Sequence, residues 1–226
     1  MKKISILLPS RGRIEQTKAS VESLFTLADD PTRFEICARI DSDDVESIKL
    51  YEQLAIDHDN VKYVIKKRGK GYHILNVLYD EAMSMSDPEA DYVYVWGNDN
   101  IMETRGWDTK LIACTVKNPA VVWPNKNGLY YCFPIVNKRW FTLFGNGKFP
   151  DCPFVDTFFY FTMMYAVKTT SRDTEELETL SGLDVRHNIV HDVIHNEAKK
   201  KEAPRPTRDA IVKNAIIDAA KLVKEW

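Results

Sequence analysis

Apolar runs alternate with segments of helical spacing along the first hundred residues. The short runs stop at proline, glycine or polar clusters, which predicts buried strands of a parallel sheet. Segments with an apolar residue at every third or fourth position predict helices packed on that sheet. The expected strands cover residues 4–8, 34–40, 61–65 and 92–96, and the expected helices cover residues 14–28, 45–55 and 75–85. This alternation predicts an α/β fold with a mostly parallel sheet, helices on both faces and right-handed crossovers.

The pattern is less regular after residue 100. The expected elements are a helix over residues 107–116, strands over 120–123, 129–136 and 185–194, a helix or loop over 137–144, and an aromatic helix over 154–167. Pro204 and Pro206 precede a last segment whose apolar residues recur at helical spacing. We expect one domain over residues 1–226, made of halves 1–100 and 101–203 and a C-terminal amphipathic helix in 204–226.

Composition narrows the class of protein. The net charge of −2 provides no overall electrostatic footprint for nucleic acid. The four cysteines lack CxxC spacing, which favours a reducing compartment without a disulfide framework or a zinc site. The first apolar run stops at Pro9, too short for a signal sequence, and no apolar segment is long enough to span a membrane. We therefore expect a soluble, cytoplasmic protein with no membrane partner.

Polar side chains follow each of the four expected strands. They are the segments Pro9-Ser10-Arg11-Gly12-Arg13, Asp41-Ser42-Asp43-Asp44, Lys70-Gly71-Tyr72 and Gly97-Asn98-Asp99-Asn100. The carboxyl ends of parallel strands meet at one edge of the sheet, where ligands bind in such folds. Four polar segments at that edge predict a nucleotide site, although each alone is weak evidence.

The chemistry of these segments suits a nucleotide. Arg11 and Arg13 can donate to phosphate or base at a helix start. Asp41 and Asp43 can accept from a ribose hydroxyl or a base imide, if Asp44 caps the next helix and leaves them free. The carboxylate of Asp99 between two amides suits Mg²⁺ or Mn²⁺, whereas the alternative is an Asn/Asp turn that closes the strand.

In this order, the segments LLPSRGR, IDSDD, GKGYHILN and VWGNDN resemble the signatures of GT-A fold glycosyltransferases, notably the family-2-like group. The resemblance covers the first half and implies a Rossmann-like GT-A fold whose residues 1–100 bind a nucleotide sugar. It implies three sets of residues: Pro9, Ser10 and Arg11 with Asp41 or Asp43 for the nucleoside, Lys70, Gly71 and Asn76 facing the donor, and Asn98 and Asp99 in the metal motif. The motif departs from the family pattern because only Asp99 is acidic, although an Asn carbonyl can still ligate a metal.

The second half is expected to hold the catalytic and acceptor groups. Asp156 lies in an aromatic run, where burial would suit a general base; helix capping is the alternative, and Asp151 is the second candidate. The resemblance favours the base, because inverting GT-A enzymes carry an Asp at the start of a helix after the metal strand. It also implies one late His in the metal shell. His187, His191 and His195 recur every four residues, and His191 is favoured.

These observations predict a metal-dependent glycosyltransferase with Mn²⁺ or Mg²⁺ and a nucleotide-sugar donor, a UDP-sugar being favoured. The short chain and its Gly106-Trp107-Asp108 segment are similar to bacteriophage enzymes of this fold, so hydroxymethylated DNA pyrimidines in the host cytoplasm are one expected acceptor and a glycan the other. Asp108 itself is expected to be a first-turn helix charge. Two alternatives stay open: a nucleotidyltransferase, which needs a longer loop after the first strand, and a non-catalytic nucleotide-binding protein, favoured by the missing second acid.

Overall fold

A computed structural model describes residues 3–69, 75–113, 121–125, 133–144, 148–149, 155, 158–162, 179–187 and 217–218. The elements in chain order are β1 (Ile4–Ser10), α1 (Ile14–Leu27), η1 (Pro31–Arg33), β2 (Phe34–Asp41), α2 (Val45–Asp57), β3 (Val61–Lys66), α3 (Leu75–Met83), β4 (Tyr92–Val95), β5 (Asn100–Met102), α4 (Trp107–Ala113), β6 (Val121–Asn125), β7 (Ile135–Asn137), α5 (Arg139–Phe144) and β8 (Thr179–His187). Seven of them form the alternating strands and helices predicted for the first hundred residues.

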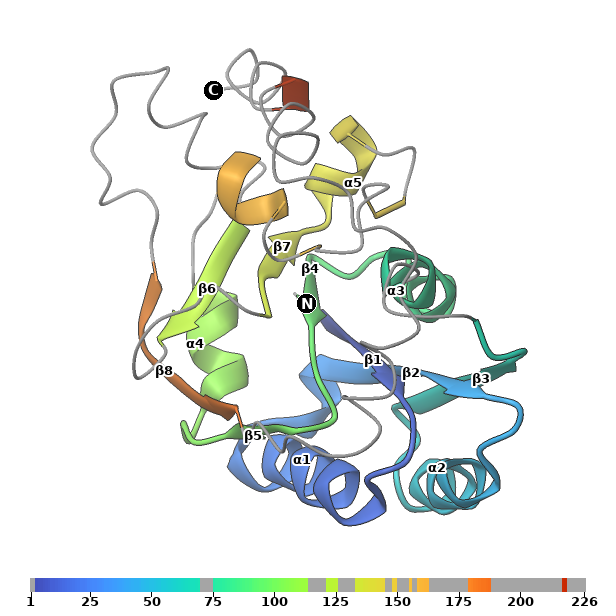
Figure 1. Cartoon of the computed structure of the whole chain (residues 1–226). Coiled ribbons are helices and arrows are strands. Elements are labelled where there is room, and N and C mark those ends of the chain that lie inside the picture. Colours follow the sequence, from blue (N-terminus) through green and yellow to red (C-terminus); the bar gives the residue numbers. More distant parts are fainter. Residues whose placement is uncertain are drawn as a thin grey trace, which may run out of the picture.

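The strands form one sheet in the order β3-β2-β1-β4-β7-β6-β8-β5. The strands β3, β2, β1 and β4 are parallel to their neighbours, and β7 joins the edge of β4 in antiparallel orientation. Helices α1 and α2 lie on one side of this parallel part and α3 on the other (Figure 1). The predicted α/β class with a mostly parallel, helix-flanked sheet is therefore confirmed. Of the predicted C-terminal helix, the structure describes only residues 217–218, which are helical.

Two details of the second half differ from the sequence prediction. The strand expected over residues 185–194 is β8, which begins six residues earlier, at Thr179, and is described as far as His187. The short strand β5 was not predicted, because three residues directly after a turn carry too little periodicity to be recognised. It pairs with β8 in antiparallel orientation, with Asn100 opposite His187.

Both faces of the parallel strands β1, β2 and β4 are buried, because side chains alternate between two hydrophobic clusters. Tyr92 and Tyr94 of β4 and the following Trp96 join the cluster under α1, α2 and α4, whereas Val93 and Val95 face the cluster under α3 and α5. Strand β1 divides its apolar residues in the same way. Burial on both sides explains the continuous apolar runs of these three strands, whereas the edge strand β3 carries exposed residues.

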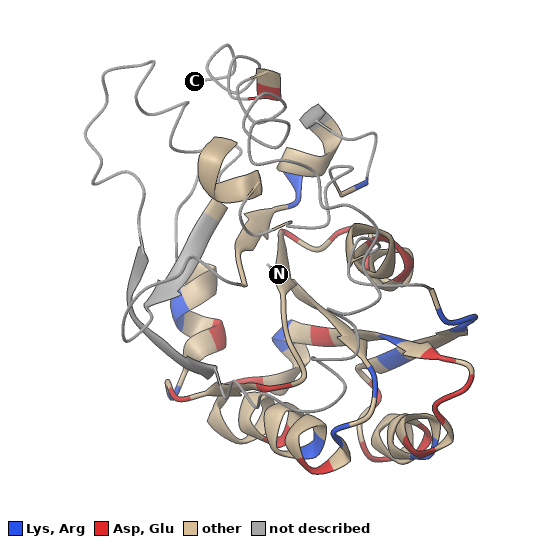
Figure 2. Ribbon diagram, in the orientation of Figure 1, with Lys and Arg blue, Asp and Glu red and all other residues tan. Residues whose placement is uncertain are grey.

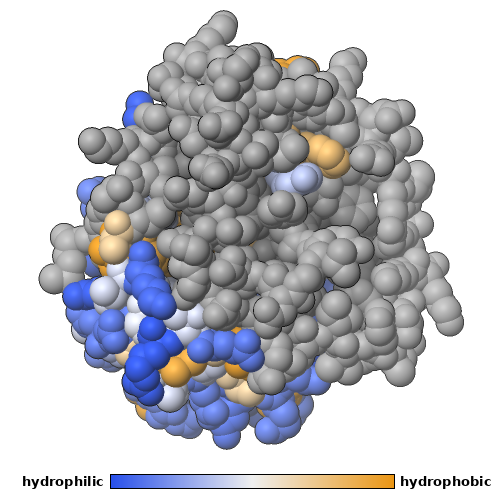
Figure 3. Space-filling view, turned by 90° about the vertical axis from the view of Figure 1, so that its left-hand side faces the viewer, coloured by the Kyte–Doolittle hydropathy of each residue, from blue (hydrophilic) through white to orange (hydrophobic). Residues whose placement is uncertain are grey.

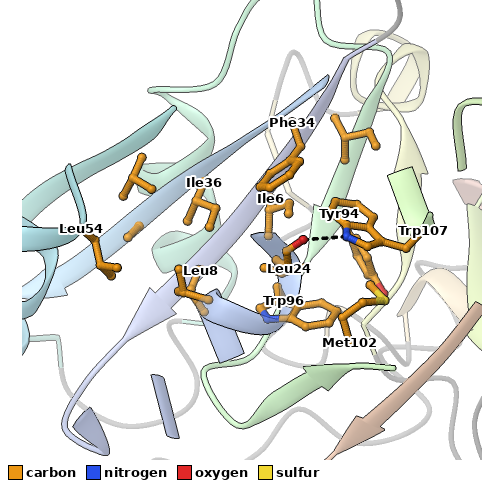
Figure 4. Packing of buried hydrophobic residues seen from close by; sticks show 14 of the residues in the cluster. Ile6, Leu8, Leu24, Phe34, Ile36, Leu54, Tyr94, Trp96, Met102 and Trp107 are labelled. Atoms are coloured by element: carbon orange, nitrogen blue, oxygen red, sulfur yellow. Dashed lines mark hydrogen bonds between the residues drawn. The ribbon is translucent and has the colours of Figure 1, made fainter. Parts of the chain in front are cut away.

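Helix α1 holds the end of β4 in place through two serine hydroxyl groups. The Trp96 indole donates to Ser20 Oγ at 2.8 Å, and the backbone N–H of Met102 donates to Ser23 Oγ at 2.9 Å. These bonds fix both sides of the turn that connects β4 and β5. Trp96 and Met102 lie side by side against α1 in the core (Figure 4).

The Gly-Trp-Asp segment anchors the other end of α1. Gly106 N–H donates to the Leu27 carbonyl at 2.7 Å, and the Trp107 indole donates to the Leu24 carbonyl at 2.9 Å (Figure 4). The fully buried Asp108 accepts from the backbone N–H groups of Asp29 and Asp30 at 2.8 and 3.0 Å. Asp108 thus lies in the first turn of α4, as predicted, and it closes the loop after α1 rather than facing a ligand.

Charged residues of both signs are interspersed over the described surface. Lys and Arg lie close to Asp and Glu along α1 and α2 and around the ends of β2 and β3 (Figure 2). On the face drawn in Figure 3, the described residues are mainly hydrophilic and the hydrophobic ones are scattered between them. Among the described helices, none has both the length and the apolar character that crossing a bilayer requires.

Candidate nucleotide site at the carboxyl edge of the sheet

The ends of three parallel strands bring the predicted residues together. Ser10 at the end of β1 lies opposite Ile40 of β2, and Asp41 at the end of β2 lies opposite Lys66 of β3. On the other side of β1, Trp96 N–H donates to the Leu7 carbonyl at 3.0 Å, which places the β4–β5 turn beside the loop after β1. The segments after β1, β2 and β4 therefore share one edge, as predicted.

Arg11 bridges the two candidate acids that follow β2. Its Nη1 lies 2.9 Å from Asp41 Oδ2 and 2.5 Å from Asp43 Oδ1, and its Nη2 lies 3.2 Å from Asp43 Oδ2. The hydrogen bond from Arg11 lowers the pKa of Asp43. Asp41 is nearly buried, whereas half of the Asp43 side chain is exposed. The expectation that both acids are free is wrong, because Arg11 is paired with both of them.

Asp44 caps α2, as predicted, and it also holds the loop after β1. Its Oδ1 accepts from Ser47 N–H at 3.3 Å, and its Oδ2 accepts from Gly12 N–H at 2.6 Å. Gly12 has a φ of 57°, in the left-handed region that glycine tolerates. The cap of α2 thereby fixes the backbone between Arg11 and Arg13.

Arg39 is a site residue that sequence reasoning missed. It lies inside β2 with only 3% of its surface exposed, and it is paired with Asp41 Oδ1. Its Nε donates to Glu81 of α3 at 2.7 Å, and its Nη2 donates to the Lys67 carbonyl at 2.8 Å. Arg39 thus joins β2, α3 and the loop after β3 behind Asp41. The signal was an arginine in the apolar strand FEICARID, since a buried charge needs a partner.

Arg13 and Asp99 join the loop after β1 to the motif after β4. Arg13 Nη1 lies 2.9 Å from Asp99 Oδ2, and about one eighth of each side chain is exposed. Gly97 makes room for this arrangement, because a Cβ there would lie 2.9 Å from Asp99 Oδ1 and 2.9 Å from the Phe133 ring. The turn interpretation also holds, since Asn100 N–H donates to the Gly97 carbonyl at 3.1 Å.

The remaining candidates differ in their exposure. Ser10 is 4% exposed, and its hydroxyl lies beside that of the buried Tyr51. Pro9 is half-buried. Asn76 in α3 and Asn98 in the motif are buried at 6% and 9% exposure, so both amides point mainly into the protein. Asn98 is thus enclosed, whereas Asp99 is only partly buried.

The donor set suits a divalent cation only in part. Asp99 is the one acid of the motif, and the described part of the chain contains no cluster of three or more His, Cys, Asp or Glu residues. The register of β5 and β8 brings His187 opposite Asn100, at the motif itself. A carboxylate with few further protein ligands fits Mg²⁺ or Mn²⁺ when substrate phosphates complete the shell.

Several predicted residues lie outside the described part of the chain. They are Lys70 and Gly71 of the donor set, Asp151 and Asp156 as candidate bases, and His191 and His195 as candidate metal ligands. Their roles stay predictions from the sequence.

No family model matches the sequence, and no curated protein matches it. The structure does resemble solved ones. The mannosyltransferase PcManGT from Pyrobaculum calidifontis, in complex with GDP-Man and Mn²⁺, has a TM-score of 0.64 at 10% identity, over 96% of this chain and 73% of that one. S. aureus TarS 1–349 has a TM-score of 0.53 at 14% identity, over 70% of this chain and 54% of that one. The same fragment in complex with UDP has a TM-score of 0.56 at 14% identity, over 72% and 55%.

The chain thus spans about half the length of the TarS fragment that it resembles. Sequence identities this low carry information about the fold and not about the substrate. The chain has a GT-A-like fold, that of the mannosyltransferase PcManGT.

Proposed function

We propose that the protein is a glycosyltransferase that moves a sugar from a nucleotide-sugar donor to an acceptor hydroxyl. The observation that carries the proposal is the pairing of Arg11 with Asp41 and of Arg13 with Asp99 at the carboxyl edge of a GT-A-like sheet. One pair supplies groups for a base and the other supplies groups for a diphosphate. In open α/β sheets this edge is where ligands bind.

The first pair suits a nucleobase with an imide edge. Asp41 offers carboxylate oxygens, and Arg11 offers N–H groups within 2.9 Å of them. Uracil and guanine present a ring N–H beside a carbonyl, so the N–H can donate to Asp41 and the carbonyl can accept from Arg11. Cytosine and adenine present a bare ring nitrogen there, which a carboxylate repels. We therefore favour a UDP-sugar, with a GDP-sugar as the second candidate.

The second pair lies where a diphosphate would leave. Asp99, with Asn98 beside it, would hold Mg²⁺ or Mn²⁺ together with phosphate oxygens, and His187 or His191 would complete the shell. The cation would neutralise charge that develops on the departing diphosphate. Asp156 would take the proton from the acceptor hydroxyl, as a positioned general base.

The acceptor that we propose is a hydroxymethylated pyrimidine in DNA, as in the bacteriophage enzymes that the sequence resembles. Lys66 at the end of β3 and the following Lys67 and Arg68 are exposed next to the donor edge, and they can contact a phosphate backbone. The net charge of −2 predicts weak DNA binding that falls steeply with salt. A glycan acceptor is the rival.

The donor test is a titration with UDP, GDP, CDP and ADP in the presence of Mn²⁺, followed by calorimetry. UDP or GDP should bind and CDP should not, and Asp41→Asn should abolish the preference. Hydrolysis of the matching nucleotide sugar then separates an enzyme from a nucleotide-binding protein. The acceptor test offers hydroxymethylated duplex, plain duplex and free glycans, with mass spectrometry of the product. Transfer to a glycan alone would exclude the DNA acceptor and keep the glycosyltransferase.

A further inference from the structure

Two residues with unusual backbone geometry flank the acid of the motif. Among the described residues, Arg13 and Phe133 are the non-glycine residues with positive φ, at 53° and 59°. The side chain of Arg13 bonds Asp99, and the ring of Phe133 covers Gly97, two residues before it. The left-handed conformation costs an L-residue about 1–2 kcal/mol, so strain at this spot is a feature that the surrounding structure maintains.

The strain at Arg13 has a clear geometric effect. The preceding Gly12 is also left-handed, and its N–H is tied to Asp44. The chain therefore turns sharply before α1, and this turn sends the Arg13 guanidinium toward the end of β4. Arg13 stands at the N-cap of α1 without a capping bond from its side chain. The Arg13 side chain therefore binds Asp99 of the motif and does not cap the helix.

One oxygen of the Asp99 carboxylate is paired with a guanidinium, and the other lies close to the backbone of the motif. Oδ2 lies 2.9 Å from Arg13 Nη1, and Oδ1 folds back over Gly97. A cation that takes Asp99 as a ligand must therefore bind a carboxylate that is already paired with the Arg13 guanidinium. A guanidinium and a divalent cation repel each other at such short range. Each therefore binds the carboxylate more weakly when the other is also bound.

We propose that Arg13 and the divalent cation exchange at Asp99. This inference rests on the proposed function and deepens it. Without donor, Arg13 occupies the carboxylate and keeps the motif closed to free metal. When a nucleoside diphosphate arrives with its cation, the carboxylate passes to the cation, and the released guanidinium contacts the diphosphate. Metal binding is thereby coupled to donor binding, and the coupling is reciprocal.

The test uses Arg13→Asn, because asparagine tolerates the left-handed region but carries no charge. In an EPR titration of the protein without nucleotide, Mn²⁺ should bind about tenfold more tightly to the variant than to the wild type, a difference of about 1.4 kcal/mol. Arg68→Asn is the matched control, since it removes one positive charge from the same edge and leaves Asp99 untouched. It should not change the Mn²⁺ affinity.

A second readout follows the released guanidinium. With saturating Mn²⁺, Arg13→Asn should bind UDP about tenfold more weakly, whereas its affinity for uridine should match that of the wild type. Arg13→Gly, which relieves the backbone strain, should repeat both results and guards against misfolding of the first variant. Asp99→Asn should bind no Mn²⁺, whether it is introduced into the wild type or into the Arg13→Asn variant.

Two outcomes would overturn the exchange. One is an Mn²⁺ affinity that is unchanged or lower in both Arg13 variants, and the other is the absence of Mn²⁺ binding in all of them. Neither outcome excludes sugar transfer, which donor binding and transfer by the wild type test separately, although the second would also remove the metal role of Asp99. Conversely, if Mn²⁺ and Arg13 exchange at Asp99 but the wild type transfers no sugar, the exchange is supported and the proposed glycosyltransferase activity is rejected.

Discussion

Arg39→Met should destabilise the protein by about 3 kcal/mol. The Arg39 side chain is 3% exposed, forms ion pairs with Asp41 and Glu81, and donates a hydrogen bond to the Lys67 carbonyl. Removing one partner of a buried pair costs about 3–5 kcal/mol, because the other charge stays buried. The lower end applies, since Glu81 is 28% exposed and Asp41 keeps its bond to Arg11.

The assay is equilibrium unfolding in urea. With a slope of about 2 kcal/mol per molar, the midpoint should fall by about 1.5 M at constant slope. Arg33→Met is the matched control, since its guanidinium is 29% exposed and its pairs with Asp30 and Asp108 are longer, at 3.2 and 3.8 Å. It should cost no more than about 1 kcal/mol. Arg39→Lys keeps the positive charge, but the lysine ammonium lacks the planar guanidinium that reaches three acceptors at once. We therefore expect a midpoint between those of the wild type and Arg39→Met, together with weakened UDP binding. A midpoint for Arg39→Met as high as that of the control would refute the reasoning.

Three further predictions concern other positions. Burial raises the pKa of Asp80, whose carboxylate accepts from Phe149 N–H at 2.6 Å. A raised folded-state pKa favours the folded protein below the unfolded pKa of about 4 and disfavours it above. Asp80→Asn should therefore raise the melting temperature at pH 7 and lose this gain below pH 4, as calorimetry across pH can check. Gly106→Ala should lower the melting temperature by several degrees, because φ is +67° and the new Cβ would lie 2.6 Å from Asp29 Oδ2. Asp156→Asn should keep donor binding and lower turnover by about 10²–10⁴, and near-normal turnover would place the base elsewhere.

The sequence was sufficient for the first half of the fold because each signal there is local. The apolar runs mark the strands, of which β1, β2 and β4 have two buried faces. The capping residue Asp44 lies three residues before Ser47, whose N–H it binds. The shared edge of Arg11, Asp41 and Asp99 followed from strand order alone. The prediction that this edge is a polar cluster is confirmed for the described residues.

The pairings within that cluster could not be predicted. Arg39 meets Glu81 across 42 residues, and Arg13 meets Asp99 across 86. The order of charged residues along the sequence does not determine which of several acids an arginine pairs with in the folded structure. The left-handed backbone of Arg13 is also invisible in the sequence, because arginine has no preference for that region. Partnerships of this kind depend on tertiary contacts that no local pattern contains.

The anchoring of α1 by the Gly-Trp-Asp segment has a consequence for dissecting the chain. The bonds from Trp107 and Asp108 to α1 and its loop span 78 to 83 residues. A fragment that stops at residue 100 would carry every nucleotide-edge segment after β1, β2 and β4, yet it would lack the groups that secure the far end of α1. During synthesis, these bonds can form only after residue 108 has been added to the chain. We therefore expect split-protein fragments cut near residue 100 to reassemble only when the second piece includes this segment, and a cut after residue 113 to be the better tolerated one.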